Sequence, residues 1–426
     1  ECHARFGATF TVRTITHGPV VMVSTAEDIR RVLAAPGDLA LGGSANFVLK
    51  PLLGRHSLLL LDGGEHQRMR KLQAPPFHGD RALGVGEAVL ALADDAIDRT
   101  PVGEPFSALA LLQDLALRVI MRSVLGLAEG DPHWGLRDRF LEVMEAFGWP
   151  PMRLTFLHVD LGPKSPWGRF VRAYDAVDAG VAEVVARRRA EGGGARADVL
   201  SMLLDARDER GEGLGRDEVR DALLTLVVAG HDTSASALAW GLHGLLDEPG
   251  VWHRLRAEVA ECAADGRLEA RAVERLPFLD AVVREALRWT PVIISIGRRL
   301  AAPLELGGRL VPAGVIVSPS IYLAHRNPAV YAAPGLFRPQ RFLTSKPGPY
   351  EFLPFGAGAR RCLGAAFATQ TMKMVLAALA LRTEPKRAPG APPVRPVRRS
   401  VTVTPSGGLP IVFARKAPRG QALGAA

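Results

Sequence analysis

Cysteine is scarce in this chain of 426 residues, in which only Cys2, Cys262 and Cys362 occur. So few thiols, in an odd number, argue against a disulfide framework and favour a reducing compartment. Long apolar runs are also missing, because the longest, at 223–230 and 375–381, are far too short to span a bilayer. The first residues lack the charged start and the apolar stretch of a signal peptide. We therefore expect a soluble, cytoplasmic protein.

Positive charge is in excess, but no nucleic-acid-binding pattern accompanies it. Lys and Arg number 53 against 44 Asp and Glu, which gives a formal net charge of +9. The arginines are scattered along the chain, with neither a basic stripe interleaved with aromatic residues nor zinc-finger spacing. Nucleic-acid binding is therefore not expected. A basic surface that attracts an acidic protein partner is the better interpretation.

The pattern along the chain predicts one mixed, mostly helical domain. Residues 10–16 and 19–23 are rich in Val, Ile and Thr and predict two strands. From about 28 to 288, apolar residues three and four apart predict helices. No internal repeat or clean linker appears, so we expect a single domain over residues 1–414 followed by a loose tail at 415–426.

The C-terminal third returns to a mixed pattern. Residues 315–321 predict a strand, and residues 363–381 predict a last helix. Residues 401–404 and 409–413 flank Pro-Ser-Gly-Gly at 405–408, which predicts that the two segments pair as a hairpin.

The strongest motif is the loop Phe-Gly-Ala-Gly-Ala-Arg-Arg-Cys-Leu-Gly at 355–364. Gly356, Gly358 and Gly364 permit close backbone approach and positive φ. A cysteine that opens a helix lies where free N–H groups and the helix dipole stabilise a thiolate, which predicts a lowered pKa for Cys362.

Two other side chains of this loop suit a bound cofactor. Phe355 is placed to cover one side of the sulfur, and the fork of Arg360 suits a carboxylate. A buried structural thiol is the usual interpretation of an isolated cysteine. A glycine-rich loop with two arginines is a poor place for an inert thiol, so we favour a metal ligand.

Residues 217–246 predict one long helix that carries Ala-Gly-His-Asp-Thr at 229–233. A glycine inside a helix costs about 1 kcal/mol relative to alanine. Room for a ligand against the backbone is the reason we expect for Gly230. The hydroxyl of Thr233 is placed to bond back to the carbonyl of Ala229 and open a kink. A helix that merely tolerates polar residues is the alternative.

Three further groups of polar residues have suggestive spacing. Asp62–Glu65 forms a capping-box pattern at a helix start, and His66 and Arg70 then lie four apart on one face. Glu285 and Arg288 lie one turn apart near the end of an apolar-periodic helix, where they are able to pair.

The chain resembles the cytochrome P450 family, soluble bacterial type, over nearly its whole length. Residues 355–364 match the signature Phe-x-x-Gly-x-Arg-x-Cys-x-Gly at every fixed position. Residues 229–233 match Ala/Gly-Gly-x-Asp/Glu-Thr, and residues 66–70 match His-x-x-x-Arg. Glu285–Arg288 matches the buried Glu-x-x-Arg pair, and residues 337–342 resemble the loop that supplies its third member, here Arg341.

The resemblance implies a fold that is mainly α with small β-sheets, a triangular prism around one long helix. It implies heme b as the cofactor, with Cys362 as the iron ligand. The implied cofactor-contacting residues are His66, Arg70, Ala229, Arg298, Phe355, Gly356, Arg360, Cys362 and Gly364. Arg298 is preferred to Arg299 for a propionate. Gly230, Asp232 and Thr233 are the implied catalytic residues, while Glu285, Arg288 and Arg341 brace the cysteine loop.

The implied reaction is insertion of one oxygen atom from O2 into a hydrophobic substrate. The stretches expected to shape the pocket are apolar, which favours a fatty acid, terpenoid, steroid or polyketide; they are 41–61, 146–161, 226–233, 292–296 and 406–408. No reductase segment is attached, so electrons are expected from a separate ferredoxin or flavodoxin with its reductase.

Two alternatives and one departure accompany the resemblance. A peroxide-driven peroxygenase is disfavoured because Asp232 and Thr233 are both present, and a heme-binding sensor or carrier is the third possibility. The first residues resemble a point already inside the family's first helix. A truncated start is therefore expected, which leaves a membrane anchor upstream open.

Overall fold

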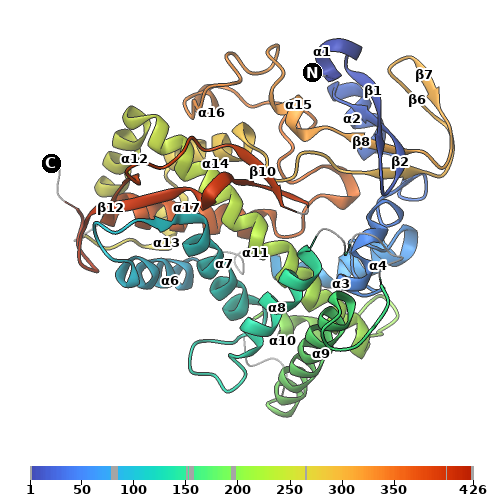
Figure 1. The fold of residues 1–426 in the computed structure, drawn as a ribbon, viewed down its shortest axis with the longest axis horizontal. Coiled ribbons are helices and arrows are strands. Elements are labelled where there is room, and N and C mark those ends of the chain that lie inside the picture. The colour runs from blue at the N-terminus through green and yellow to red at the C-terminus, as the bar shows by residue number, and fades with distance from the viewer. Residues whose placement is uncertain are drawn as a thin grey trace.

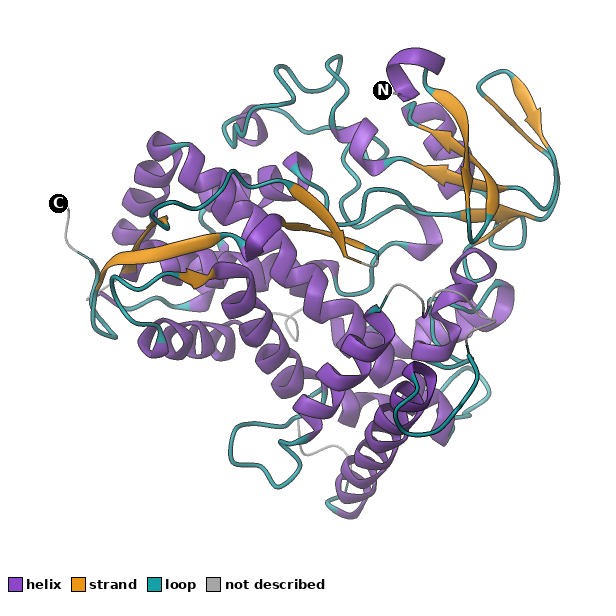
Figure 2. Ribbon diagram, viewed as in Figure 1, coloured by secondary structure: helices purple, strands orange, loops and turns teal. Residues whose placement is uncertain are grey.

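The computed structural model describes residues 2–77, 85–149, 152, 158–192, 198–263, 266–399 and 401–423. Helices make up most of the body, and strands gather mainly on two opposite sides of it (Figure 2). The N-terminal strands lie on one side and the C-terminal strand β12 on the other (Figure 1). This architecture confirms the predicted class, mainly α with small sheets.

The helices follow one another closely along the chain. In chain order they are α1 (Cys2–Phe6), α2 (Ala26–Leu33), α3 (Lys50–Leu53), α4 (Gly63–Gln73), α6 (Gly86–Arg99), α7 (Ala108–Val124), α8 (Leu136–Gly148), α9 (Pro166–Ala190), α10 (Val199–Asp205), α11 (Arg216–Asp247), α12 (Pro249–Cys262), α13 (Ala270–Glu274), α14 (Pro277–Trp289), α15 (Ile321–His325), α16 (Arg341–Thr344) and α17 (Ala365–Arg382).

Helix α11 is the central element, with 32 residues, and it confirms the long helix predicted over 217–246. It runs diagonally through the molecule between α7, α14 and α17 (Figure 1). By length and hydropathy alone it could cross a bilayer. Most of its apolar window is instead buried inside the fold, as expected of a core helix.

The largest sheet has five strands in the order β1-β2-β8-β5-β3. The first two strands form an antiparallel hairpin and β8 adds in parallel to β2, which confirms the strands predicted at 10–16, 19–23 and 315–321. The strands are β1 (Thr9–Thr14), β2 (Gly18–Val23), β3 (Ala40–Leu41), β5 (Arg298–Leu300) and β8 (Ile316–Pro319). A small separate hairpin joins β6 (Leu304–Leu306) and β7 (Arg309–Val311).

The hairpin predicted across 405–408 is wrong. Strand β11 (Thr402–Pro405) pairs with β10 (Pro396–Arg399), whereas β12 (Pro410–Lys416) pairs with β9 (Thr383–Arg387) and β4 (Phe106–Ser107). The hydroxyl of Ser107 donates to the carbonyl of Gly408 at 3.0 Å. Gly407 and Gly408 have positive φ, so the chain turns away into another sheet instead of folding back.

The loose tail predicted from residue 415 is also wrong for the part that the structure describes. Strand β12 continues to Lys416, whose ammonium donates to the carbonyls of Ile97, Asp98 and Thr100. Further along, the Leu423 N–H donates to the Leu381 carbonyl at 2.8 Å. These bonds fasten the segment to α6 and α17.

A buried ion pair joins α9 to the start of α10. Arg188 and Asp198 are 1% and 6% exposed. Arg188 donates to both Asp198 carboxylate oxygens and to the Leu125 carbonyl, while Asp198 also accepts the Ser201 N–H at the helix start. A charge this deep depends on its partner for stability.

We expect Asp198→Asn to cost about 3 kcal/mol, because the buried Arg188 charge then keeps only the partly exposed Glu191 carboxylate, 3.6 Å away, as a counter-ion. The midpoint of urea denaturation would report the loss. The control is Glu27→Gln at the exposed Glu27–Arg31 pair, where a change of at most about 1 kcal/mol is expected. Equal shifts in the two variants would contradict the argument.

Candidate functional site

The cysteine loop is tied to itself by backbone hydrogen bonds. The Cys362 N–H donates to the Phe355 carbonyl at 2.8 Å, and the Gly356 N–H donates to the Leu353 carbonyl at 3.0 Å. Phe355 therefore lies beside Cys362, and its side chain packs against the buried hydrophobic residues that α6, α7, α11, α14 and α17 contribute to the core. The residues that the sequence groups into one motif form one closed loop.

Two of the three motif glycines have the predicted conformation. Gly356 and Gly358 have φ of 67° and 70°. A Cβ on Gly358 would lie 2.0 Å from the Leu33 carbonyl oxygen, so no larger residue fits there. Gly364 differs, with φ of −85° and open space where a Cβ would point. Neither backbone conformation nor a contact within the protein therefore requires glycine at position 364.

The predicted lowering of the Cys362 pKa is wrong. Helix α17 begins at Ala365, three residues beyond the cysteine, and burial raises the pKa of the thiol. The Gly364 N–H and the charges of Arg361 and Arg70 oppose that shift without overcoming it. A coordinated metal ion deprotonates a thiol outright, so ligation does not need a preformed thiolate.

The surroundings of Cys362 combine two properties. A large part of the Cys362 surface is accessible to solvent. Enough protein nevertheless surrounds the thiol for burial to be the largest influence on its pKa. Both hold for a side chain that lies inside the fold and faces an open space. Such a position suits a ligand to a bound group.

A cluster of positive groups lies beside the loop. His66 and Arg70 come from α4, Arg298 from β5 and Arg360 from the cysteine loop. Burial lowers the pKa of His66 to about 4, helped by the charges of the three arginines and opposed by Asp62. Three guanidinium groups therefore lie within electrostatic reach of one imidazole.

Positive charge in this cluster exceeds the negative charge beside it. Arg298 is 8% exposed and donates to the adjacent Gly297 carbonyl at 2.8 Å. Burial and the charge of Arg360 lower its pKa to about 10, against the opposing charge of Asp62. Buried like charges are costly unless anions join them. The cluster is therefore suited to bind an anionic group.

Arg360 meets a carboxylate, but it is the protein's own. Its guanidinium donates to Asp62 at 2.6 Å and to the Leu61 carbonyl. Asp62 also accepts the N–H groups of Gly43 and Ser44, each at 2.8 Å. The capping box predicted at 62–65 is therefore wrong, because the Asp62 side chain makes no cap bond to α4. A guanidinium has five donors, so one bound carboxylate does not exhaust it.

The structure separates Arg298 from its neighbour. Arg299 is half-buried and donates to the Gly314 carbonyl at 2.8 Å. Successive residues of a strand point to opposite faces, and it is Arg298 whose charge acts on His66. This geometry supports the choice of Arg298.

The middle of α11 has a face that side chains leave uncovered. Ala229 is exposed and Thr233 half-buried, although both belong to the core helix. The Thr233 hydroxyl donates to the Ala229 carbonyl at 2.6 Å, which confirms the predicted bond. A Cβ at Gly230 would lie 2.9 Å from the end of the Ile120 side chain of α7. The end of the Ile120 side chain would have to shift to admit a larger residue, so α7 packs closely on α11 at this glycine.

Asp232 has two hydrogen-bond partners that the sequence did not predict. The Gln113 side chain of α7 donates to one carboxylate oxygen at 2.8 Å, and the Thr402 hydroxyl of β11 donates to the other. Nothing in the sequence around Gln113 or Thr402 indicates this role. The contact also shows that β11 approaches this part of α11.

The predicted trio around Glu285 is confirmed. Glu285 and Arg288 are both 0% exposed and form two hydrogen bonds, at 2.7 and 2.8 Å. Arg341 adds a third at 3.2 Å, and the backbone N–H of Arg338 adds a fourth at 2.6 Å. The carboxylate is thus paired and hydrogen-bonded, as a buried charge must be.

His325 connects this trio to the cysteine loop and was missed in the sequence. Arg288 donates to the His325 carbonyl at 2.9 Å, and the ring Nε2 accepts the Leu353 N–H at 3.0 Å. Leu353 in turn accepts from Gly356. A continuous path of bonds therefore supports the loop from Glu285, which agrees with the bracing role.

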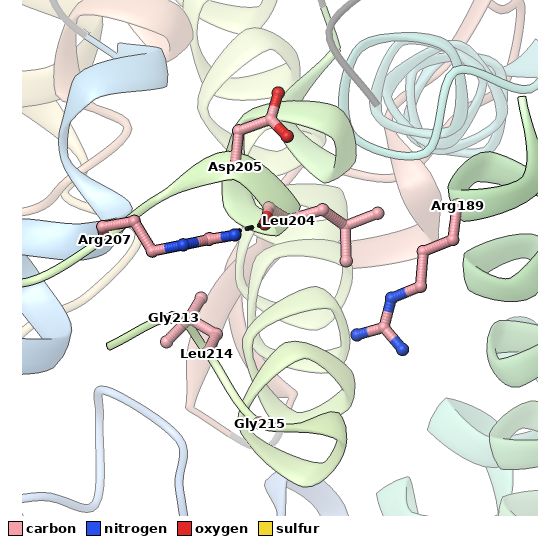
Figure 3. A pocket seen from close by; sticks show the side chains of 7 residues that line it. All are labelled: Arg189, Leu204, Asp205, Arg207, Gly213, Leu214 and Gly215. Carbon is pink, nitrogen blue, oxygen red and sulfur yellow. Dashed lines mark hydrogen bonds between the residues drawn. The ribbon is translucent and has the colours of Figure 1, made fainter. Parts of the chain in front are cut away.

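A cavity of about 480 Å³ lies elsewhere, beside α10 and the start of α11. Figure 3 shows Arg189 and Arg207 at its edge, with Arg207 bonded to the Leu204 carbonyl. None of the predicted site residues lines it. It is separate from the cysteine loop.

Acid should destabilise the fold through His325. Burial and the charge of Arg288 lower its pKa from 6.5 to about 3. Below pH 6.5 the unfolded chain binds a proton at this histidine that the folded chain does not bind. The free energy of unfolding therefore decreases as the pH is lowered, until the pH reaches the pKa of the folded state. His325→Gln keeps an acceptor for Leu353 but does not titrate. We expect the free energy of unfolding of this variant to decrease less with falling pH than that of the wild type. The two slopes should differ by about 1.4 kcal/mol per pH unit.

The measurement is the free energy of unfolding at a series of pH values between the two pKa values. His253→Gln, a change at an exposed histidine, is the control and should retain the wild-type slope. A His325→Gln slope equal to that of the wild type would contradict the assignment.

Comparison with known proteins agrees with this site. A family model described as Cytochrome P450 matches residues 1–411. The chain is 35% identical over 384 residues to a Mycobacterium tuberculosis protein named cytochrome P450 135B1, covering 90% of this chain and 80% of that protein. It is 35% identical over 413 residues to cytochrome P450 137 of the same organism, covering 96% and 83%.

Solved structures share the fold. A retinoic acid-bound cyanobacterial CYP120A1 superposes with a TM-score of 0.85 at 24% identity, covering 97% of this chain and 92% of that one. The heme domain of cytochrome P450DA gives 0.82 at 21% identity, covering 98% and 91%. With the family match and the mycobacterial relatives, these findings show that the chain belongs to the cytochrome P450 family of heme-binding monooxygenases.

Proposed function

We propose that the protein inserts one oxygen atom from O2 into a hydrophobic organic substrate, with Cys362 as the thiolate ligand of a heme b iron. The observation that carries the proposal is the excess of buried positive charge beside the cysteine loop. Iron protoporphyrin IX has two propionates, which are the anions that such a cluster lacks. The residues present therefore fit this cofactor.

The holders of the cofactor follow from that fit. Cys362 would ligate the iron, while Arg298, Arg360, Arg70 and His66 would hold the propionates. His66 is kept neutral by its lowered pKa, so it would contribute a hydrogen bond rather than a charge. Gly364 has open space at its Cβ position, which leaves room beside the thiolate.

The bound heme would supply oxygen activation, which the thiolate assists by pushing electron density that favours O–O cleavage. The protein's own part is to hold protons and position groups. Thr233 keeps its hydroxyl on the open face of α11 through its bond to Ala229. Asp232 is the neighbouring acid and would donate protons toward that face. The path from Glu285 through His325 would keep the cysteine loop in place.

The substrate and the electron donor are proposed from chemistry. Leu226, Val228 and Ala229 leave part of their apolar surface uncovered on α11, which suits a hydrophobic substrate such as a fatty acid or terpenoid. The net charge of +9 suits an acidic electron carrier, a ferredoxin or flavodoxin served by its reductase. The scarcity of cysteine supports a cytoplasmic location.

The test of the thiolate is the spectrum of the reduced protein with carbon monoxide. The wild type should show the red-shifted Soret band of a thiolate-ligated heme. Cys362→Ser should lose that band because a serine hydroxyl does not replace a thiolate. Cys262→Ser, at a half-buried cysteine of α12, is the control and should retain it. Loss in neither variant, or no such band in the wild type, would overturn the proposal.

The propionate assignment is tested by exchanging one arginine at a time. Arg298→Gln should release heme to apomyoglobin at least roughly tenfold faster, since a charge-assisted bond worth about 1.5–3 kcal/mol is lost. Arg299→Gln is the control, because that side chain is bonded to Gly314. Equal release rates in the two variants would count against Arg298.

A further inference from the structure

The carboxylate of Asp232 is held between two elements that are far apart in the sequence. Gln113 of α7 donates to Oδ1, and Thr402 of β11 donates to Oδ2. Both partners are neutral, so Asp232 is held by hydrogen bonds rather than by an ion pair. Among the described residues, no salt bridge to Asp232 is found, although its neighbours on α7 and α8, Asp114 and Arg137, do pair with each other.

Thr402 has one hydroxyl proton and two acceptors for it. Its Oγ1 lies within hydrogen-bonding distance of Asp232 Oδ2 and, at 2.9 Å, of the Arg399 carbonyl. A threonine hydroxyl donates once but accepts twice. With Asp232 charged, Thr402 donates to Asp232. With Asp232 protonated, the carboxyl O–H donates to Thr402, and Thr402 donates to Arg399.

The position of Thr402 is fixed by bonds on the next residue. The Val403 N–H donates to the Val292 carbonyl at 2.9 Å, and the indole N–H of Trp240 donates to the Val403 carbonyl at 2.9 Å. Trp240 belongs to the same helix as Asp232, two turns further along. Strand β11 is therefore fastened to α11, and the hydroxyl of Thr402, which is 3% exposed, stays where Asp232 reaches it.

We propose that Thr402 is a positioning residue that holds Asp232 in one orientation in both its charged and its protonated form. Gln113 assists in both forms, because it donates to Oδ1, which stays an acceptor when the proton is on Oδ2. This inference rests on the proposed function, in which Asp232 supplies protons to the open face of α11. Thr402 would then act on the reaction only through Asp232.

The proton movements balance without any further reagent. To deliver its proton, the Asp232 O–H turns from Thr402 to a water or hydroxyl on the open face and gives the proton up, which leaves a carboxylate. The Thr402 hydrogen then turns from Arg399 to Oδ2 and stabilises the new charge. A proton taken up from solvent restores the acid and returns the Thr402 hydrogen to Arg399. No heavy atom needs to move between the two states.

The first readout is infrared spectroscopy and needs neither substrate nor turnover. A difference spectrum between each protein and its own Asp232→Asn partner isolates the carboxyl bands of that residue. In Thr402→Val these bands should shift, because valine neither donates nor accepts. Thr402→Ser keeps the hydroxyl and should retain the wild-type bands. Thr404→Val is the matched control on the same strand, since its hydroxyl bonds to the Val397 carbonyl instead.

The second readout is the product of O2 reduction, peroxide or water, when the protein turns over in air without any substrate. A ferredoxin and its reductase supply electrons from NADPH, and hydrogen peroxide is measured against NADPH oxidised. Reduction of one O2 to hydrogen peroxide consumes two electrons and two protons, whereas reduction of one O2 to two waters consumes four of each. With proton delivery impaired, Thr402→Val should lower the four-electron rate by roughly tenfold and raise the share that ends as peroxide. Thr402→Ser and Thr404→Val should match the wild type.

The outcomes distinguish this inference from the proposed function. Shifted bands together with more peroxide in Thr402→Val alone would support it. Wild-type bands or a wild-type electron partition in Thr402→Val would overturn it, provided that the red-shifted carbon monoxide band is present. Absence of that band in the wild type is a failure of the proposed function, and the infrared result still decides the hydrogen bond. Should Thr402→Val not fold, Thr402→Ala takes its place with the same expectations.

Discussion

The buried ion pair between the Glu285 carboxylate and Arg288 is the interaction on which the cysteine loop depends. A charge that is 0% exposed is tolerated only when every lone pair is engaged. Arg288, Arg341 and the backbone of Arg338 supply that engagement, and Arg288 in turn holds the carbonyl of His325. The cost of burying one acid thus orders three segments that lie far apart in the sequence.

On the other side of the loop the electrostatics are unbalanced rather than complete. Burial lowers the pKa of Arg298 and of His66, and Asp62 alone offsets neither shift. The same low dielectric that makes the Glu285 pair strong makes this excess charge costly. Around Glu285 the protein's own residues neutralise the buried charge, whereas the cluster that contains Arg298 and His66 is suited to bind an anion. This difference distinguishes the brace from the proposed cofactor contacts.

The central helix combines structural and chemical duties within one turn and a half. Gly230 faces the end of the Ile120 side chain at close range, the Thr233 hydroxyl donates to the Ala229 carbonyl, and Asp232 accepts hydrogen bonds from α7 and β11. Consecutive helical residues point about 100° apart, so each one meets a different neighbour. A motif of five letters therefore serves several elements of the fold.

The sequence by itself determined the features whose parts are close along the chain. The cysteine loop, the long helix and the pairing of Glu285 with Arg288 follow from spacing, because a turn or a helix fixes which neighbours meet. Only the tertiary structure decided the partners of Arg360 and Asp232, which lie 298, 119 and 170 residues away. It also decided that β11 pairs backward with β10 and that burial raises the pKa of Cys362. Hydrogen-bond partners and dielectric surroundings depend on packing to within about an ångström, and local spacing does not specify that.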